Sequence, residues 1–181
     1  MHAFDDLQRG LEHVRQLYFH DDGSTPNSHL PVLHYHLRST NGAALADAFG
    51  ALFSENQWIP LWRAGIYDYH HYHSTAHEAL AVVHGRARVT LGGESGQTLS
   101  LEPGDVLVLP AGTGHRCVEC SKDFLVVGAY PRGQEDYDIQ RPGSGNHADS
   151  QGRIARVPLP EADPLGGVEG PLMTAWGPQV S

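Results

Sequence analysis

The sequence predicts an all-β protein built as an antiparallel barrel or sandwich. Between residues 62 and 130, short apolar or alternating runs are separated by turn sequences. Residues 86–91 alternate apolar and polar side chains, which indicates a strand with one solvated face. Residues 106–109 and 124–127 are apolar at every position, as expected for strands that are buried on both faces.

The segment before this core is predicted to add edge strands and one helix. Residues 30–37 are typical of a strand, whereas residues 13–19 are ambiguous. Within residues 41–56 the apolar side chains recur at helical spacing, and Asn41 is suited to cap the start of that helix.

The segment after the core is predicted to be an extended arm. Residues 131–181 hold most of the prolines and show little periodicity, so we expect them to lie against the barrel or against a neighbouring subunit. The length suits one core and is short for two. We therefore expect a single domain over residues 1–181, with its core barrel at about 62–130.

Charge and hydropathy exclude several classes of partner. The net charge is −9 and the pI about 5.7, so nucleic acid and anionic membranes would be repelled by the average surface. No stretch approaches the roughly 20 apolar residues of a membrane span. These observations predict a cytoplasmic protein whose partner is a small molecule.

Two of the many histidines stand two positions apart, in a strand-like run. Side chains alternate between the two faces of a strand, so His71 and His73 should project the same way. Glu78 follows a short bend and could add a carboxylate from the next strand. A lone pair of this kind is weak evidence, because two exposed histidines are the commoner explanation.

The wider spacing adds a second ordered pattern. The first run reads Gly65-x5-His71-x-His73-x4-Glu78-x6-Gly85. The second, after an intervening pair of strands, reads Gly104-x5-Pro110-x-Gly112-x2-His115. The glycines would serve turns or close backbone approaches, and Pro110 would end a strand.

Together these runs resemble the two motifs of the cupin superfamily, except that Glu119 stands where the second motif usually ends in asparagine. Residues 68–78, 123–131 and 157–171 also resemble the uncharacterised bacterial one-domain cupins of the YjlB type. The resemblance implies an antiparallel double-stranded β-helix, the cupin or jelly-roll barrel, here with one N-terminal-side helix and an extended C-terminal arm. It implies no particular activity.

The resemblance also implies a metal site formed by His71, His73, Glu78 and His115. Three imidazoles and one carboxylate suit divalent Fe, Mn, Ni or Zn and leave positions open for a substrate. Cupins with such ligands include dioxygenases, sugar-phosphate isomerases and decarboxylases, which implies a small oxygen-rich metabolite. The alternatives are a binding module without turnover and a purely structural barrel.

Strand parity also indicates residues that could touch a substrate. Tyr67 and Tyr69 share the parity of His71, and Cys117 shares that of His115. For each of the three, packing in the core is the alternative. His77 has the parity opposite to Glu78, although a local bend could let it replace Glu78 as a ligand.

The remaining patterns are given less weight. A second pair, His34 and His36, has no carboxylate at the spacing seen after His73, so a solvated strand face is expected. Cys117 and Cys120 form a C-x-x-C pair in a strand-like run without a second such pair, which argues against zinc or thioredoxin-like chemistry. Finally, an antiparallel barrel of this size leaves an edge strand to be covered, which predicts a homodimer.

Overall fold

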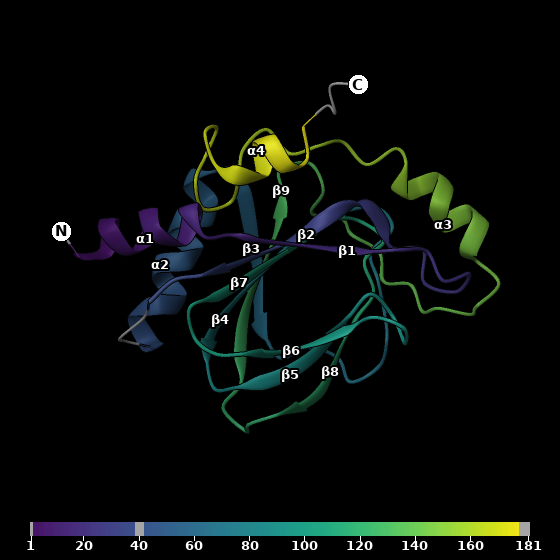
Figure 1. Ribbon diagram of the computed structural model, residues 1–181, viewed down its shortest axis with the longest axis horizontal. Coiled ribbons are helices and arrows are strands. Elements are labelled where there is room, and N and C mark those ends of the chain that lie inside the picture. The colour runs from purple at the N-terminus through teal and green to yellow at the C-terminus, as the bar shows by residue number, and fades with distance from the viewer. Residues whose placement is uncertain (1, 39–41, 178–181) are drawn as a thin grey trace.

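The computed structural model describes residues 2–38 and 42–177, and Figure 1 shows their arrangement. Nine strands and four helices occur in these residues, in the following order. They are α1 (His2–Glu12), β1 (Arg15–Phe19), β2 (Ser28–His36), α2 (Gly42–Glu55), β3 (Trp58–Ala64), β4 (Glu78–His84), β5 (Ala87–Leu91), β6 (Gln97–Leu101), β7 (Asp105–Leu109), β8 (His115–Cys120), β9 (Leu125–Pro131), α3 (His147–Ile154) and α4 (Pro171–Ala175).

The strands form two sheets, and every strand pair is antiparallel. The larger sheet has the order β1-β2-β7-β4-β9-β3, and the smaller has the order β6-β5-β8. Figure 1 shows the smaller sheet across one side of the larger, while α1, α2 and α4 lie toward the opposite side. This is the predicted antiparallel double-stranded β-helix.

The large sheet is buried on both faces. In β7, Leu107 and Leu109 belong to an inner core between the two sheets. Their neighbours Val106 and Val108 belong to an outer core, which is completed by α2 and by the C-terminal segment. The uninterrupted apolar run of residues 106–109 is explained by this double burial.

The helical content differs from the prediction of one N-terminal-side helix. The expected helix is present as α2, and its predicted cap, Asn41, lies outside the described residues. A second helix, α1, precedes it and packs Leu7 and Leu11 against the outer core. Its apolar residues are few, so the sequence signal was weak. The ambiguous stretch at 13–19 contains β1.

The C-terminal segment is less extended than predicted, because it includes the short helices α3 and α4. It does lie against the barrel as expected. Leu165, Leu172 and Trp176 are buried in the outer core, and Trp176 Nε1 donates a hydrogen bond of 2.8 Å to the Pro31 carbonyl oxygen. Among the described residues, no helix is both long and apolar enough to cross a membrane.

Two motif glycines differ in what the backbone requires of them. Gly112 has a φ of 96°, and a Cβ placed there would lie 2.4 Å from the carbonyl oxygen of Asn27. Gly65 has no positive φ, and a Cβ there would meet nothing within 4 Å. The backbone role predicted for Gly65 is therefore wrong, and this residue lines a pocket instead.

Candidate metal centre

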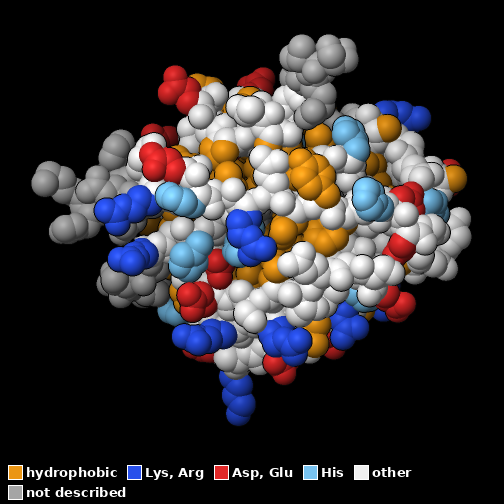
Figure 2. Space-filling view, viewed as in Figure 1, with side chains coloured by type: hydrophobic (Ala, Val, Ile, Leu, Met, Phe, Trp, Pro, Cys, Tyr) orange, Lys and Arg blue, Asp and Glu red, His pale blue; other side chains and the backbone are white. Residues whose placement is uncertain are grey.

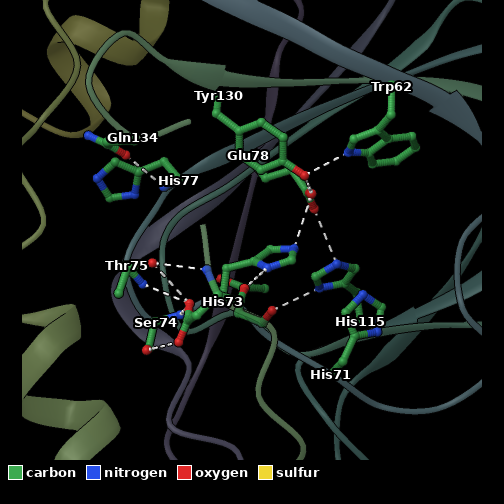
Figure 3. A network of polar contacts seen from close by, with 12 residues as sticks. Trp62, His71, His73, Ser74, Thr75, His77, Glu78, His115, Tyr130 and Gln134 are labelled. Carbon is green, nitrogen blue, oxygen red and sulfur yellow. Dashed lines mark hydrogen bonds and ion pairs between the residues drawn. The ribbon is translucent and has the colours of Figure 1, made fainter. Parts of the chain in front are cut away.

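Three histidines from two separate segments converge at one end of the inner core (Figure 3). His71 and His115 form a β-bridge, in which each backbone N–H donates to the other residue's carbonyl oxygen, at 3.2 and 2.9 Å. Their ring centroids are 4.0 Å apart, and the ring of His73 lies 5.4 Å from that of His115. All three side chains are buried, so the i, i+2 parity brings His71 and His73 together as predicted.

The backbone fixes the same orientation for all three imidazoles. Nδ1 of His71, His73 and His115 lies 3.0, 2.5 and 3.0 Å from the carbonyl oxygens of Tyr69, Asp138 and Thr113, respectively. A carbonyl oxygen only accepts, so each Nδ1 carries a proton and donates it. Each neutral ring then keeps a free lone pair on Nε2, which is the arrangement expected of metal-binding histidines.

Glu78, the first residue of β4, faces these nitrogens. Its Oε2 lies 3.1 Å from His73 Nε2, and its Oε1 lies 3.2 Å from His115 Nε2. Oε1 has no hydrogen-bond partner among the described residues. A carboxylate oxygen and an imidazole lone pair repel each other at this distance unless a proton or a cation lies between them.

Tyr130 and Trp62 hold the carboxylate of Glu78 from behind. Trp62 Nε1 donates a 2.8 Å hydrogen bond to Tyr130 Oη, and Tyr130 Oη donates to Glu78 Oε2. Burial, and next the negative charge of Glu78, raises the pKa of Tyr130 far above its usual range. Tyr130 therefore remains a proton donor to Glu78 at any physiological pH.

The pKa values of His71 and His73 shift in opposite directions. Burial, followed by repulsion from a charged His115, lowers the pKa of His71 to about 3. Burial also acts to lower the pKa of His73, but the carboxylate of Glu78 outweighs it and raises the pKa. Burial acts to raise the pKa of Glu78, yet the positive charge of a protonated His73 and the proximity of the His115 ring hold it well below its usual range. The site thus contains an ionised carboxylate and at least one neutral imidazole, a donor set that suits a divalent transition metal.

The centre lies on the floor of a pocket of about 280 Å³. Tyr67, one of the predicted substrate contacts, lines this pocket. Tyr69, which was expected to share this pocket, lines a different cavity instead. Its ring stacks on that of Tyr67 at 4.9 Å, and Arg141 lies 4.1 Å from its centroid. Cys117 packs in the inner core. This position agrees with core packing, the alternative to a substrate contact.

Comparisons with known proteins agree with the two sequence motifs. A family model described as "Cupin domain" matches residues 63–127. The chain is also 34% identical over 168 residues to the "Uncharacterized protein YjlB" of Bacillus subtilis (strain 168), which covers 92% of this chain and 99% of that protein. The chain belongs to the YjlB-type cupins.

Two solved structures are similar to parts of this cupin. The DMSP lyase DddQ from Ruegeria pomeroyi DSS-3 is 19% identical, with a TM-score of 0.36 over 62% of this chain and 42% of that chain. The cupin 2 domain-containing protein from Halorhodospira halophila is 14% identical, with a TM-score of 0.33 over 81% of this chain and 82% of that chain. The cupin thus spans less than half the length of the DddQ chain.

His77, the rival to Glu78, points away from the metal centre (Figure 3). Its Nδ1 accepts a hydrogen bond of 2.9 Å from the backbone N–H of Ala111, and its ring lies 4.9 Å from that of Trp176. Burial lowers its pKa to about 4. His77 is therefore a neutral side chain that anchors the C-terminal segment.

His34 and His36 differ from the expected solvated face. Both bond to Oδ1 of Asp105, through His34 Nε2 at 2.9 Å and His36 Nδ1 at 2.8 Å. Only the His36 side chain is half-exposed, and His34 is mostly buried. The carboxylate comes from β7, the partner strand of β2, so spacing along the chain could not reveal it.

Three residues that support the candidate ligands could not be predicted from the sequence. Tyr130 and Trp62 hold Glu78, and the Asp138 carbonyl orients His73. The Asp138 carboxylate in turn accepts hydrogen bonds from Ser74 N at 2.7 Å and Thr75 N at 3.1 Å. The available signal was general: a tyrosine within a buried apolar run needs a partner for its hydroxyl group.

Proposed function

We propose that His71, His73, Glu78 and His115 bind one divalent transition metal ion (Fe, Mn, Ni or Zn), and that this cupin is a metal-dependent enzyme. Its substrate is a small oxygen-rich metabolite that chelates the ion, in a dioxygenase-, isomerase- or decarboxylase-like reaction. The supporting observation is that the ligand nitrogens of three buried imidazoles, each tied at Nδ1 to a backbone carbonyl, lie within 4.8 Å of one another, and that two of them, on His73 and His115, face the carboxylate of Glu78 at 3.1 and 3.2 Å.

The residues of the chain have separate roles in this proposal. A bound ion would supply Lewis acidity or activate oxygen. Tyr130 and Trp62 orient Glu78 and keep its carboxylate ionised. The aromatic walls of the pocket limit the access of water to the floor, and Tyr67 at the mouth contacts the incoming ligand.

Metal content and turnover test the two parts separately. The untagged protein should contain close to one transition metal ion per chain by elemental analysis, and His71→Ala should lose most of it. His29→Ala is the matched control, because His29 is exposed and distant in sequence from the ligands. An unchanged metal content in His71→Ala would remove the histidines from the site.

A turnover assay distinguishes an enzyme from the alternative, a module that binds a ligand without converting it. The metal-loaded protein should consume oxygen or convert at least one member of a panel of chelating metabolites. Tight binding of such a metabolite without conversion of any panel member would favour the module that captures a ligand without chemistry.

We also propose that the protein is a cytoplasmic homodimer. Cys117 and Cys120 are both free, as expected in a reducing compartment. The edge strands of both sheets leave backbone groups available for pairing with a second copy.

A further inference from the structure

The described side chains that line the pocket above the candidate metal centre include a carboxylate but no lysine or arginine. Among these described residues, Glu78 carries the only carboxylate. Arg141, which lies over the ring of Tyr69, lines a different cavity. An anionic group on a ligand would therefore find its counter-charge only at the metal.

The lack of a lysine or arginine among the described lining residues limits the negative charge that a ligand can carry. A divalent ion with one ionised carboxylate and neutral imidazoles has a net charge of +1. A monoanionic chelator neutralises that charge. A phosphate ester would add a further charge away from the ion, and burying it unpaired is costly.

The side chains of the pocket walls limit the chemical nature of the part of the ligand that does not bind the metal. Tyr130 and Tyr137 stack with ring centroids 4.0 Å apart, and Leu80 and Ile139 add aliphatic surface. The Tyr130 hydroxyl is already engaged by Trp62 and Glu78. Among the other lining residues, Tyr67 and Tyr137 carry hydroxyls, so most hydroxyl groups on a sugar-like body would exchange water for apolar walls and lose hydrogen bonds.

The volume limits the size. The cavity of about 280 Å³ lies just below the range of roughly 300–1,000 Å³ that is usual for small-molecule sites. A compact molecule can place two oxygens on the ion and keep its body within these walls, whereas a larger one would extend past the exposed rim at Tyr67 and Ile139.

We propose that the ligand of this site is a compact monoanion that chelates the metal through two oxygens and carries an apolar or planar unsaturated body, without phosphate or polyol groups. This inference rests on the proposed metal centre and narrows its oxygen-rich substrate to one chemical class. It excludes sugar phosphates.

Three probes with the same chelating head and different bodies test the inference. Each is a 2-hydroxycarboxylate: 2-hydroxy-4-methylpentanoate has an apolar body, gluconate a polyol body, and 3-phosphoglycerate a phosphate. Calorimetric titration of protein loaded with Ni²⁺ should show the apolar probe binding at least about 10-fold more tightly than either of the others, because polar groups lose their hydration in these walls.

A charge-adding variant gives the converse test. Ile139→Arg places a cation at the half-exposed rim of the pocket and should strengthen the binding of 3-phosphoglycerate at least about 10-fold relative to the apolar probe. Leu159→Arg is the control, since Leu159 is equally exposed but lies outside this pocket. It should leave the preference unchanged.

The metal content of each sample, measured before the titration, separates the two proposals. Protein that binds no metal would overturn both the metal centre and the ligand class. Metal-loaded protein that binds gluconate or 3-phosphoglycerate as tightly as the apolar probe, or binds none of the three, would overturn the ligand class alone.

Discussion

At the residue scale, the proposed metal ligands and the groups that hold them were not equally visible in the sequence. His71, His73 and Glu78 lie within eight positions of one another, so strand parity and motif spacing place them together. Tyr130 is 52 residues from Glu78. Its hydrogen bond depends on the pairing of β4 with β9, which no local pattern specifies.

Tyr130→Phe should weaken metal binding by about 10- to 100-fold, because residues that orient a metal ligand typically contribute this much. The substitution removes the proton donor to Glu78 Oε2 and leaves Trp62 Nε1 without its acceptor. Competition with a chelator of known affinity measures the change. Tyr18→Phe, at an exposed tyrosine, is the control. Equal affinities in both variants would contradict the role assigned to Tyr130.

The two motif glycines should respond differently to alanine. Gly112→Ala forces a side chain into a φ of 96° and against the Asn27 carbonyl oxygen, so we expect a loss of about 2–3 kcal/mol in the free energy of unfolding. Gly65→Ala should change it by less than about 0.5 kcal/mol, since the site is open and unstrained. Urea unfolding measures both. Similar losses would show that the motif glycines share one backbone role.

At the element scale, the central strands were predictable and the surrounding segments were not. The run at 106–109 is apolar throughout because β7 is covered by both cores. Helices α1 and α4 are stabilised by contacts with the outer core, far away in sequence, so their local patterns are weak. The same dependence on long-range pairing explains why the contact of His34 and His36 with Asp105 was missed.

The pairing of β2 with β7 should make stability sensitive to acid. Burial acts to raise the pKa of Asp105, but hydrogen bonds from His34, the Glu102 N–H and His36 outweigh it and lower the pKa. A carboxyl with a lower pKa in the folded state stabilises the fold above its unfolded pKa of about 3.9, and this contribution is lost as pH falls through the folded value. The unfolding free energy should therefore fall below about pH 4.

Asp105→Asn removes this titration and should flatten the acid limb. Urea unfolding at several values between pH 3 and 6 measures the slope for the wild type and the variant. Asp47→Asn is the control, because Asp47 forms only an exposed ion pair with Arg63. An identical acid limb in wild type and Asp105→Asn would show that this cluster does not couple folding to protonation.

At the scale of the whole molecule, the open edges of the sheets bear on assembly. The larger sheet ends at β1 and β3 and the smaller at β6 and β8. The first residues of β8 are covered by backbone hydrogen bonds with Tyr67 and His71. Three of these edge strands expose a large hydrophobic side chain: Tyr18 on β1, Leu61 on β3 and Val118 on β8. Figure 2, which has the same view as Figure 1, shows hydrophobic side chains gathered over the part of the molecule where β1 and β2 run.

We therefore predict a homodimer that uses the edge at β1. Light scattering at micromolar concentration should give twice the chain mass of 19.7 kDa, because unpaired backbone groups and exposed apolar side chains on an edge favour two-fold pairing. Tyr18→Lys should shift the mass toward the monomer, since a lysine on an edge strand opposes strand pairing. Leu61→Lys, at the opposite edge of the same sheet, should leave the dimer intact. A mass near 19.7 kDa for the wild type would reject the dimer, whereas dissociation by Leu61→Lys alone would move the interface to β3.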